Sequence, residues 1–237
     1  MFIIEYYMKK YLNENKFIVI VMIVFVLISV LLSSLVSAKV SKSNGIKIVV
    51  DAGHGGRDGG SVGVNGTIEK DINLEYALLL EKKLVAAGYT VVLTRKTGDG
   101  LYSNFAKNKK ISDMTARMEI IKKANPNLVI SIHMNSFSDS SVKGANTYYK
   151  VDDEASKQCA DIIQGCLKSY CGARNQLAKT GDYFMLNCSY YTSVLIECGF
   201  LSNSEEEILL NDSNYKETLV NAICSGLLLY FGNNVNM

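Results

Sequence analysis

The sequence predicts an α/β protein: a single domain with a largely parallel, twisted β-sheet and helices on both faces, preceded by one N-terminal hydrophobic helix. Two observations support this prediction. Short β-branched runs alternate with apolar-patterned stretches of helical length, which is typical of parallel strands joined by helical crossovers. In addition, residues 17–36 form an apolar stretch of twenty positions without a charge, and ~20 apolar residues suffice to cross a bilayer as a helix.

The N-terminal region predicts export across the cytoplasmic membrane. Lys9, Lys10 and Lys16 precede the apolar stretch, and the positive-inside rule keeps that end in the cytoplasm. The stretch exceeds the ~7–15 residues of a typical signal-peptide core, which favours an uncleaved membrane anchor. Ser37 and Ala38 resemble a small-residue cleavage site, so a cleaved signal peptide stays an alternative. The expected divisions are a cytoplasmic basic segment at 1–16, a transmembrane signal-anchor or signal peptide at 17–36, a linker at 37–45 and the folded domain at 46–232.

The first half of the domain predicts a strand, a helix and a second strand. Ile46–Asp51 is a continuous β-branched run, which is typical of a buried strand. Leu74–Ala87 has apolar residues at helical spacing and is followed by Gly88, a residue favoured just after a helix. Tyr89–Thr94 then predicts the second strand. The polar stretch Lys96–Lys110 predicts an exposed loop.

The second half continues the alternation. Ser112–Ala124 predicts a helix that ends before Pro126, because proline cannot continue a helix. Leu128–Ile132 predicts the third strand, and the apolar face of Asp152–Tyr170 predicts a helix. The remaining predictions are strands at Gly144–Val151, Tyr183–Leu186 and Ser193–Ile196 and a closing apolar helix at Asn214–Phe231.

Charge and cysteine content narrow the classes of partner and site. The net charge is +2 without a basic block, so we do not expect a nucleic-acid partner. Six cysteines in an exported chain permit disulfides, with ~15 pairings if all are bridged. Cys198 and Cys224 lie in apolar runs, which favours cysteines of the hydrophobic core. The sequence contains no CxxC pair, so a zinc site built from cysteine thiolates has little support.

The chain has two histidines, and each ends an apolar strand. His54 lies in the glycine-rich loop after the first strand, and His133 follows the third. Ligands of α/β folds bind at the carboxyl ends of the strands, and neutral imidazole is the commonest metal ligand. The two histidines therefore predict half of a zinc site. Glycines let the loop backbone approach an ion closely, whereas the spacings of nucleotide-phosphate loops are absent.

Two glutamates complete the predicted chemistry. A catalytic zinc site takes three protein ligands, so a carboxylate is expected beside the two histidines. Glu69 precedes the first helix at the same sheet edge, although an acid there also suits the helix dipole. Glu197 ends an apolar strand, where burial raises a carboxyl pKa into the range for acid/base work. Asp51 is expected to support the His54 loop.

Five segments of the domain, in the same order, resemble the zinc-dependent N-acetylmuramoyl-L-alanine amidases, a family of peptidoglycan hydrolases. The resemblance covers Ile46 to about Tyr230 and is carried by VVDAGHGGRDGG, GTIEKDINL, SIHMNS, GANTYY and IECGFLSNSEE. It implies that the chain acts on glycan strands with stem peptides. The bond cleaved is the amide between the lactyl group of N-acetylmuramic acid and L-Ala.

The resemblance also implies roles for single residues. By it, one zinc ion is held by His54, Glu69 and His133, and Glu197 is the catalytic acid/base. Asn135 and Arg117 match further family positions, with substrate binding and a purely structural role as equal alternatives.

A single hydrophobic segment before a bare domain is similar to the spore-cortex amidases, which act in muramic-δ-lactam formation before germination. Two departures from the family pattern bear on the subtype. Thr192 occupies the region where a proline commonly precedes the last strand, and Lys96–Lys110 is too short for the autoinhibitory helix of division-associated members. The alternatives are a catalytically silent peptidoglycan-binding or regulatory module and a zinc peptidase that cuts within the stem peptide. A need for an activating protein partner is left open.

Overall fold

The computed structural model describes residues 44–173, 177–187 and 190–234, together with Lys16 and Val24. The chain divides into two compact units, Met1–Lys42 and Ser43–Met237, and the fold below is that of the second. The predicted apolar span at 17–36 lies outside the described residues except for Val24, and so does the linker except for its last two residues. None of the described helices combines the length and apolar character needed to span a membrane.

Within the described residues, six strands form one sheet in the order β2-β1-β3-β6-β4-β5. Strand β4 runs antiparallel to β6, and the other neighbouring strands pair in parallel. The predicted largely parallel sheet is therefore confirmed. The strands are β1 (Lys47–Ala52), β2 (Thr90–Leu93), β3 (Leu128–Asn135), β4 (Asn146–Tyr149), β5 (Lys179–Thr180) and β6 (Ser193–Phe200).

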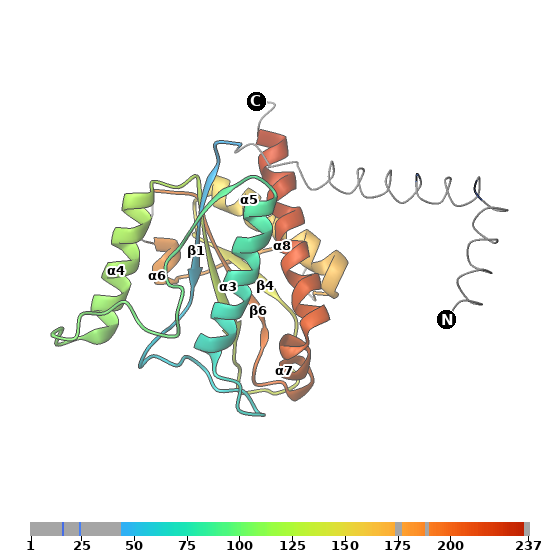
Figure 1. Cartoon of the computed structure of the whole chain (residues 1–237). Coiled ribbons are helices and arrows are strands. Elements are labelled where there is room, and N and C mark those ends of the chain that lie inside the picture. The colour runs from blue at the N-terminus through green and yellow to red at the C-terminus, as the bar shows by residue number, and fades with distance from the viewer. Residues whose placement is uncertain (1–15, 17–23, 25–43, 174–176, 188–189, 235–237) are drawn as a thin grey trace, which may run out of the picture. The chain divides into compact units, whose positions relative to one another are not determined.

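Helices cover both faces of the sheet, as predicted, but unequally (Figure 1). The helices are α3 (Glu69–Ala86), α4 (Lys109–Ala124), α5 (Glu154–Cys171), α6 (Phe184–Asn187), α7 (Ser204–Asn211) and α8 (Ser213–Asn234). On one face α3, α5 and α8 bury the main hydrophobic core against the strands. On the other face α4 and the single turn of α6 bury a much smaller cluster, formed by Val49, Ile121, Ala124, Val129 and Met185.

The alternation of side chains along β3 decides which residues reach each face. Leu128, Ile130 and Ile132 belong to the main core. Because successive side chains of a strand point to opposite faces, His133 lies on the α4/α6 face together with Val129. Glu197 of β6 pairs in register with His133, so these two residues of the predicted site are both on the thinly covered face.

Two local predictions were wrong, and one helix was not predicted. Tyr183–Leu186 is not a strand, because residues Phe184–Asn187 form the turn α6; a short apolar run does not distinguish strand from helix by its period. Helix α3 begins at Glu69, five residues before the predicted start. Helix α7 was not predicted, although Asn203 caps it by accepting a hydrogen bond from the amide of Glu206.

Five of the six cysteines lie in the described residues, and all five are free thiols. Cys159 and Cys198 are completely buried within the main core. Cys224 packs against the same core. The prediction of core cysteines is confirmed for these three.

Candidate active site

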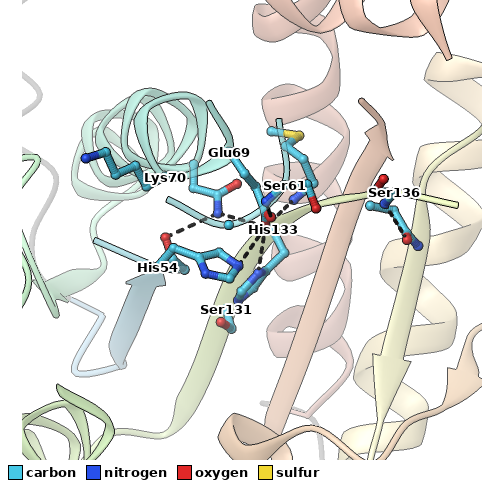
Figure 2. A network of polar contacts seen from close by, with 12 residues as sticks. His54, Ser61, Glu69, Lys70, Ser131, His133 and Ser136 are labelled. Atoms are coloured by element: carbon cyan, nitrogen blue, oxygen red, sulfur yellow. Dashed lines mark hydrogen bonds and ion pairs between the residues drawn. The ribbon is translucent and has the colours of Figure 1, made fainter. Parts of the chain in front are cut away.

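Three of the predicted residues converge at the carboxyl edge of the sheet (Figure 2). His54 lies in the loop after β1, Glu69 is the first residue of α3, and His133 lies near the end of β3. The Nε2 atom of His54 is 3.1 Å from Glu69 Oε1, and the Nδ1 atom of His133 is 3.0 Å from the same oxygen. One ligand atom from each residue lies within 4.8 Å of the others. The arrangement can hold one metal ion.

Glycines allow the loop to pack tightly around these side chains. A Cβ atom on Gly53 would lie 2.3 Å from the ring of His133. A Cβ atom on Gly60 would lie 2.4 Å from Glu69 Oε2, and Gly60 has a φ of +68°, which disfavours other residues. The glycine-rich loop thus serves close packing against the ligand side chains.

Two buried arginines hold the backbone of the loop in place. Arg95 donates from Nε to the carbonyl of Ala52 and from Nη2 to that of Gly53, both at 2.9 Å. Arg117 donates from Nη1 to the Ala52 carbonyl at 2.7 Å and from Nη2 to the carbonyl of His54. Since His54 has a φ of +61°, an unusual conformation for a residue with a side chain, these bonds support a strained position.

The sequence reasoning missed Arg95. Arg95 lies just after the end of β2, at the same edge of the sheet as His54, and the residue is 3% exposed. A charged residue that ends an apolar strand was the available signal, the same one that singled out Asp51 and Glu197.

Arg117 is occupied by protein groups. It is 1% exposed, and it pairs with Asp51 through Nη1 at 2.5 Å and with Asp113 through Nε at 2.7 Å. Burial acts to raise the pKa of Asp51, but Arg117 and the hydroxyls of Ser131 and Thr94 outweigh it and hold this pKa below its usual value. The structure therefore favours the structural alternative for Arg117. Asp51 supports the His54 loop through it, as expected, without touching the imidazole.

Electrostatics hold Glu69 in its charged form. The residue is 3% exposed, and Oε2 accepts a hydrogen bond from the amide of Ser61 at 2.8 Å. Burial acts to raise the pKa of Glu69, but the hydrogen bonds and charges of His133 and His54 hold it well below its usual value. His54 Nδ1 also lies 2.9 Å from Asp58 Oδ1, which orients the ring with Nε2 toward Glu69.

Glu197 is a buried acid with a free oxygen. The residue is only 7% exposed, and no described group forms a hydrogen bond with its Oε2 atom. Burial raises the pKa of Glu197 to about 7. A carboxyl group with this pKa can take up and release a proton near neutral pH.

A cavity of about 430 Å³ opens beside the two histidines on the α4/α6 face. Its lining includes His54, His133 and residues of α4 and α6. Asn135, the other predicted substrate contact, is not among the lining residues. Its Oδ1 accepts a hydrogen bond from the amide of Ser136 at 2.8 Å, and its carbonyl accepts one from Leu201.

Comparison with known proteins identifies the family. Residues 48–228 match the model of the N-acetylmuramoyl-L-alanine amidase family, and the chain belongs to this family. It is 34% identical over 189 residues to LytC, an N-acetylmuramoyl-L-alanine amidase of Bacillus subtilis, a match that covers 79% of this chain and 36% of LytC. It is equally similar to the germination-specific N-acetylmuramoyl-L-alanine amidase of the same organism, where the match covers 78% of this chain and 79% of that protein.

Solved structures agree with this placement. The CwlD amidase from Clostridioides difficile, solved in complex with the GerS lipoprotein, has a TM-score of 0.76 and 37% identity; the match covers 79% of this chain and 99% of that one. The catalytic domain of CwlV from Bacillus (Paenibacillus) polymyxa has a TM-score of 0.68 and 30% identity, with 79% and 98% covered. The predicted family and fold are confirmed.

Proposed function

We propose that this chain is an exported, zinc-dependent N-acetylmuramoyl-L-alanine amidase. It hydrolyses the amide between the lactyl group of N-acetylmuramic acid and L-Ala of the peptidoglycan stem peptide. The observation that carries the proposal is the convergence of His54, Glu69 and His133, together with the position of Glu197 opposite His133 in the β3–β6 pairing. The Oε2 atom of Glu197 is buried and has no hydrogen-bond partner among the described residues. Membership of the amidase family supplies the reaction class.

The residues present suit zinc. Two imidazole nitrogens and one carboxylate oxygen form a donor set found in catalytic zinc sites, which use three protein ligands. The hydrogen-bonded Ser61 amide and the Asp58 carboxylate fix the orientations of Glu69 and His54, as second partners of metal ligands do. When bound, zinc supplies Lewis-acid polarisation of the scissile carbonyl and lowers the pKa of water.

Glu197 is the proposed proton carrier. Its free oxygen accepts a proton from the attacking water while the water oxygen bonds to the lactyl carbonyl carbon. The carbon–nitrogen bond then breaks, and Glu197 returns the proton to the leaving amine of L-Ala. The pKa of about 7 suits both transfers, since the group must be a base first and an acid afterwards.

The biological setting that we propose is spore-cortex maturation, with muramic-δ-lactam formed after removal of stem peptides. Support comes from the similarity to a germination-specific amidase over 79% of that protein's length. The similar CwlD amidase was solved in complex with a lipoprotein. The proposal for this chain therefore includes a protein partner at the membrane. The apolar stretch at 17–36 supports export and an anchor in the membrane.

The test of activity is a product analysis. Purified protein from residue 43 to the C-terminus is incubated with zinc and muropeptides, and the products are weighed by mass spectrometry. Free stem peptides that begin at L-Ala are expected. Shortened stems would show the peptidase, and intact muropeptides would show the silent module or a missing activator. A second incubation with a membrane-anchored partner separates these two outcomes.

A further inference from the structure

The cavity beside the two histidines is large enough to hold several groups of a substrate. Its volume of about 430 Å³ falls in the range of small-molecule sites. Met114 of α4 and Phe184 and Met185 of α6 contribute apolar wall, while the His54 loop closes the other side. The space can therefore receive part of the substrate next to the scissile amide.

The acidic groups that line this cavity are already paired with protein groups. Asp113 accepts hydrogen bonds from Arg117 Nε at 2.7 Å and from the amide of Leu101. Asp51 is paired with the same arginine. Asp58 lies against His54 and accepts a hydrogen bond from the amide of Gly60 at 3.2 Å. These carboxylates are neutralised from within the fold.

Two cations of the same cavity are not paired in this way. Arg57 and Lys110 are exposed. Within the part of the chain that the structure describes, neither side chain forms a hydrogen bond or ion pair. Lys109, by contrast, donates to the carbonyls of Ser103 and Asn104 and lies over the ring of Tyr102. Four cations (Arg57, Lys109, Lys110 and Arg117) and three carboxylates (Asp51, Asp58 and Asp113) line the cavity, so its lining carries a net positive charge. Lys110 also acts on Asp58 through its charge. Because the donors of Arg57 and Lys110 are the ones without described partners, these two side chains are placed to receive an anionic ligand.

We propose that Arg57 and Lys110 bind the free carboxylate of the second stem-peptide residue. This inference rests on the proposed amidase function. In a stem peptide, D-glutamate follows L-Ala and is joined onward through its γ-carboxyl group, so its α-carboxylate stays free close to the scissile amide. Arginine and lysine form charge-assisted hydrogen bonds with such a group. The enzyme then discriminates against stem peptides in which this carboxylate is amidated.

The test compares two substrates that differ in this group alone: N-acetylmuramoyl-L-Ala-D-Glu and N-acetylmuramoyl-L-Ala-D-isoglutamine, each joined through its γ-carboxyl group to L-Lys amide so that no other carboxylate of the peptide is free. For the full chain with zinc, we expect kcat/KM to be at least ~10-fold higher for the carboxylate. The double variant Arg57→Gln, Lys110→Gln should raise KM for the carboxylate substrate and bring the ratio close to one. The matched control is Lys123→Gln, which removes a charge from the far end of α4 and should keep the ratio of the unaltered protein.

A binding measurement makes the test independent of turnover. Isothermal titration of the Glu197→Gln variant with the free peptide L-Ala-D-Glu-L-Lys amide, joined through the γ-carboxyl group of D-Glu, should give tighter binding than with its isoglutamine counterpart, and the double substitution should remove the difference. Equal rates on both substrates together with equal binding would overturn the subsite and leave the amidase function standing. Failure to cleave either substrate, with intact zinc binding and in the presence of the membrane-anchored partner, would instead overturn the proposed function.

Discussion

The two faces of the sheet differ in both packing and chemistry. On the face covered by α3, α5 and α8, the strands contribute apolar side chains such as Ile130, Ile132 and Ile196, all completely buried. On the α4/α6 face, the same strands contribute Ser131, His133 and Glu197 near their carboxyl ends. Because α6 is a single turn, this face stays open beside the histidines. One face supplies the stability that allows the other to bury polar and charged groups.

Neighbouring residues of β3 give the largest expected contrast. His133→Ala removes a ligand from the open face, and activity should fall by at least ~10³-fold because the metal chemistry is lost. The free energy of unfolding should change little in comparison. Amide hydrolysis and thermal unfolding are measured on the same preparation. A variant that keeps more than a tenth of the activity would contradict the ligand role.

The adjacent residue should behave in the opposite way. Ile132→Ala leaves a cavity in the main core, where the side chain is completely buried, and should lower the free energy of unfolding by about 2–5 kcal/mol. Its kcat per folded molecule should stay close to that of the unaltered protein at low temperature. Denaturant unfolding measures the free energy of unfolding. The zinc content of the preparation gives the concentration of folded sites by which the measured rate is divided to obtain kcat. If Ile132→Ala lowered the free energy of unfolding by less than His133→Ala does, the proposed difference between a stabilising face and a chemically active face would be wrong.

A pH dependence of stability is expected from Glu197. Burial raises its pKa to about 7, so the folded protein binds more protons than the unfolded chain between the two pKa values. The stability of the metal-free protein should therefore fall as the pH rises toward 7, by up to ~3 kcal/mol from this group. Glu197→Gln should flatten that part of the profile. Urea unfolding of both metal-free proteins, in the presence of a chelator, measures the free energy of unfolding at pH 5 and pH 7.5. If this free energy changed equally with pH in the two proteins, the result would argue against a raised pKa of Glu197.

The smallest expected effect concerns the support of the loop. Arg95→Gln removes hydrogen bonds to the carbonyls of Ala52 and Gly53, which should weaken zinc binding ~10- to 100-fold, as changes to the partners of metal ligands do. Competition with a fluorescent chelator measures the affinity. Lys96→Gln is a suitable control, because Lys96 is exposed and pairs only with Glu81 in the described structure. Equal affinities for the two variants would confine Arg95 to a role in folding.

The sequence allowed prediction of the parts of the site that lie at strand ends. His54, Glu69 and His133 each adjoin a strand or helix that a local pattern identifies, and parallel strands bring their carboxyl ends to one edge. The β3–β6 pairing that sets Glu197 opposite His133 required the tertiary fold. Its buried and unpartnered oxygen required side-chain packing.

The supporting contacts could not be predicted, because they join residues distant along the chain. Arg95 reaches the Gly53 carbonyl across 42 positions, and Arg117 reaches the His54 carbonyl across 63. Nothing near either arginine in the sequence indicates these acceptors. The turn α6 was missed for a related reason, since Met185 is buried in the small cluster against α4 and the sheet. Tertiary packing, which periodicity does not report, sets that conformation.

Zinc stoichiometry and turnover of four variants test the central claim most directly. The metal content of each purified protein is measured together with kcat on a muropeptide. His54→Ala, Glu69→Ala and His133→Ala should each lose both zinc and activity. Glu197→Gln should keep one zinc per chain, as expected for a single metal site, while kcat falls ~10²- to 10⁴-fold. Loss of zinc from Glu197→Gln, or full activity with zinc retained, would contradict the assignment of Glu197 as the proton carrier beside a three-ligand site.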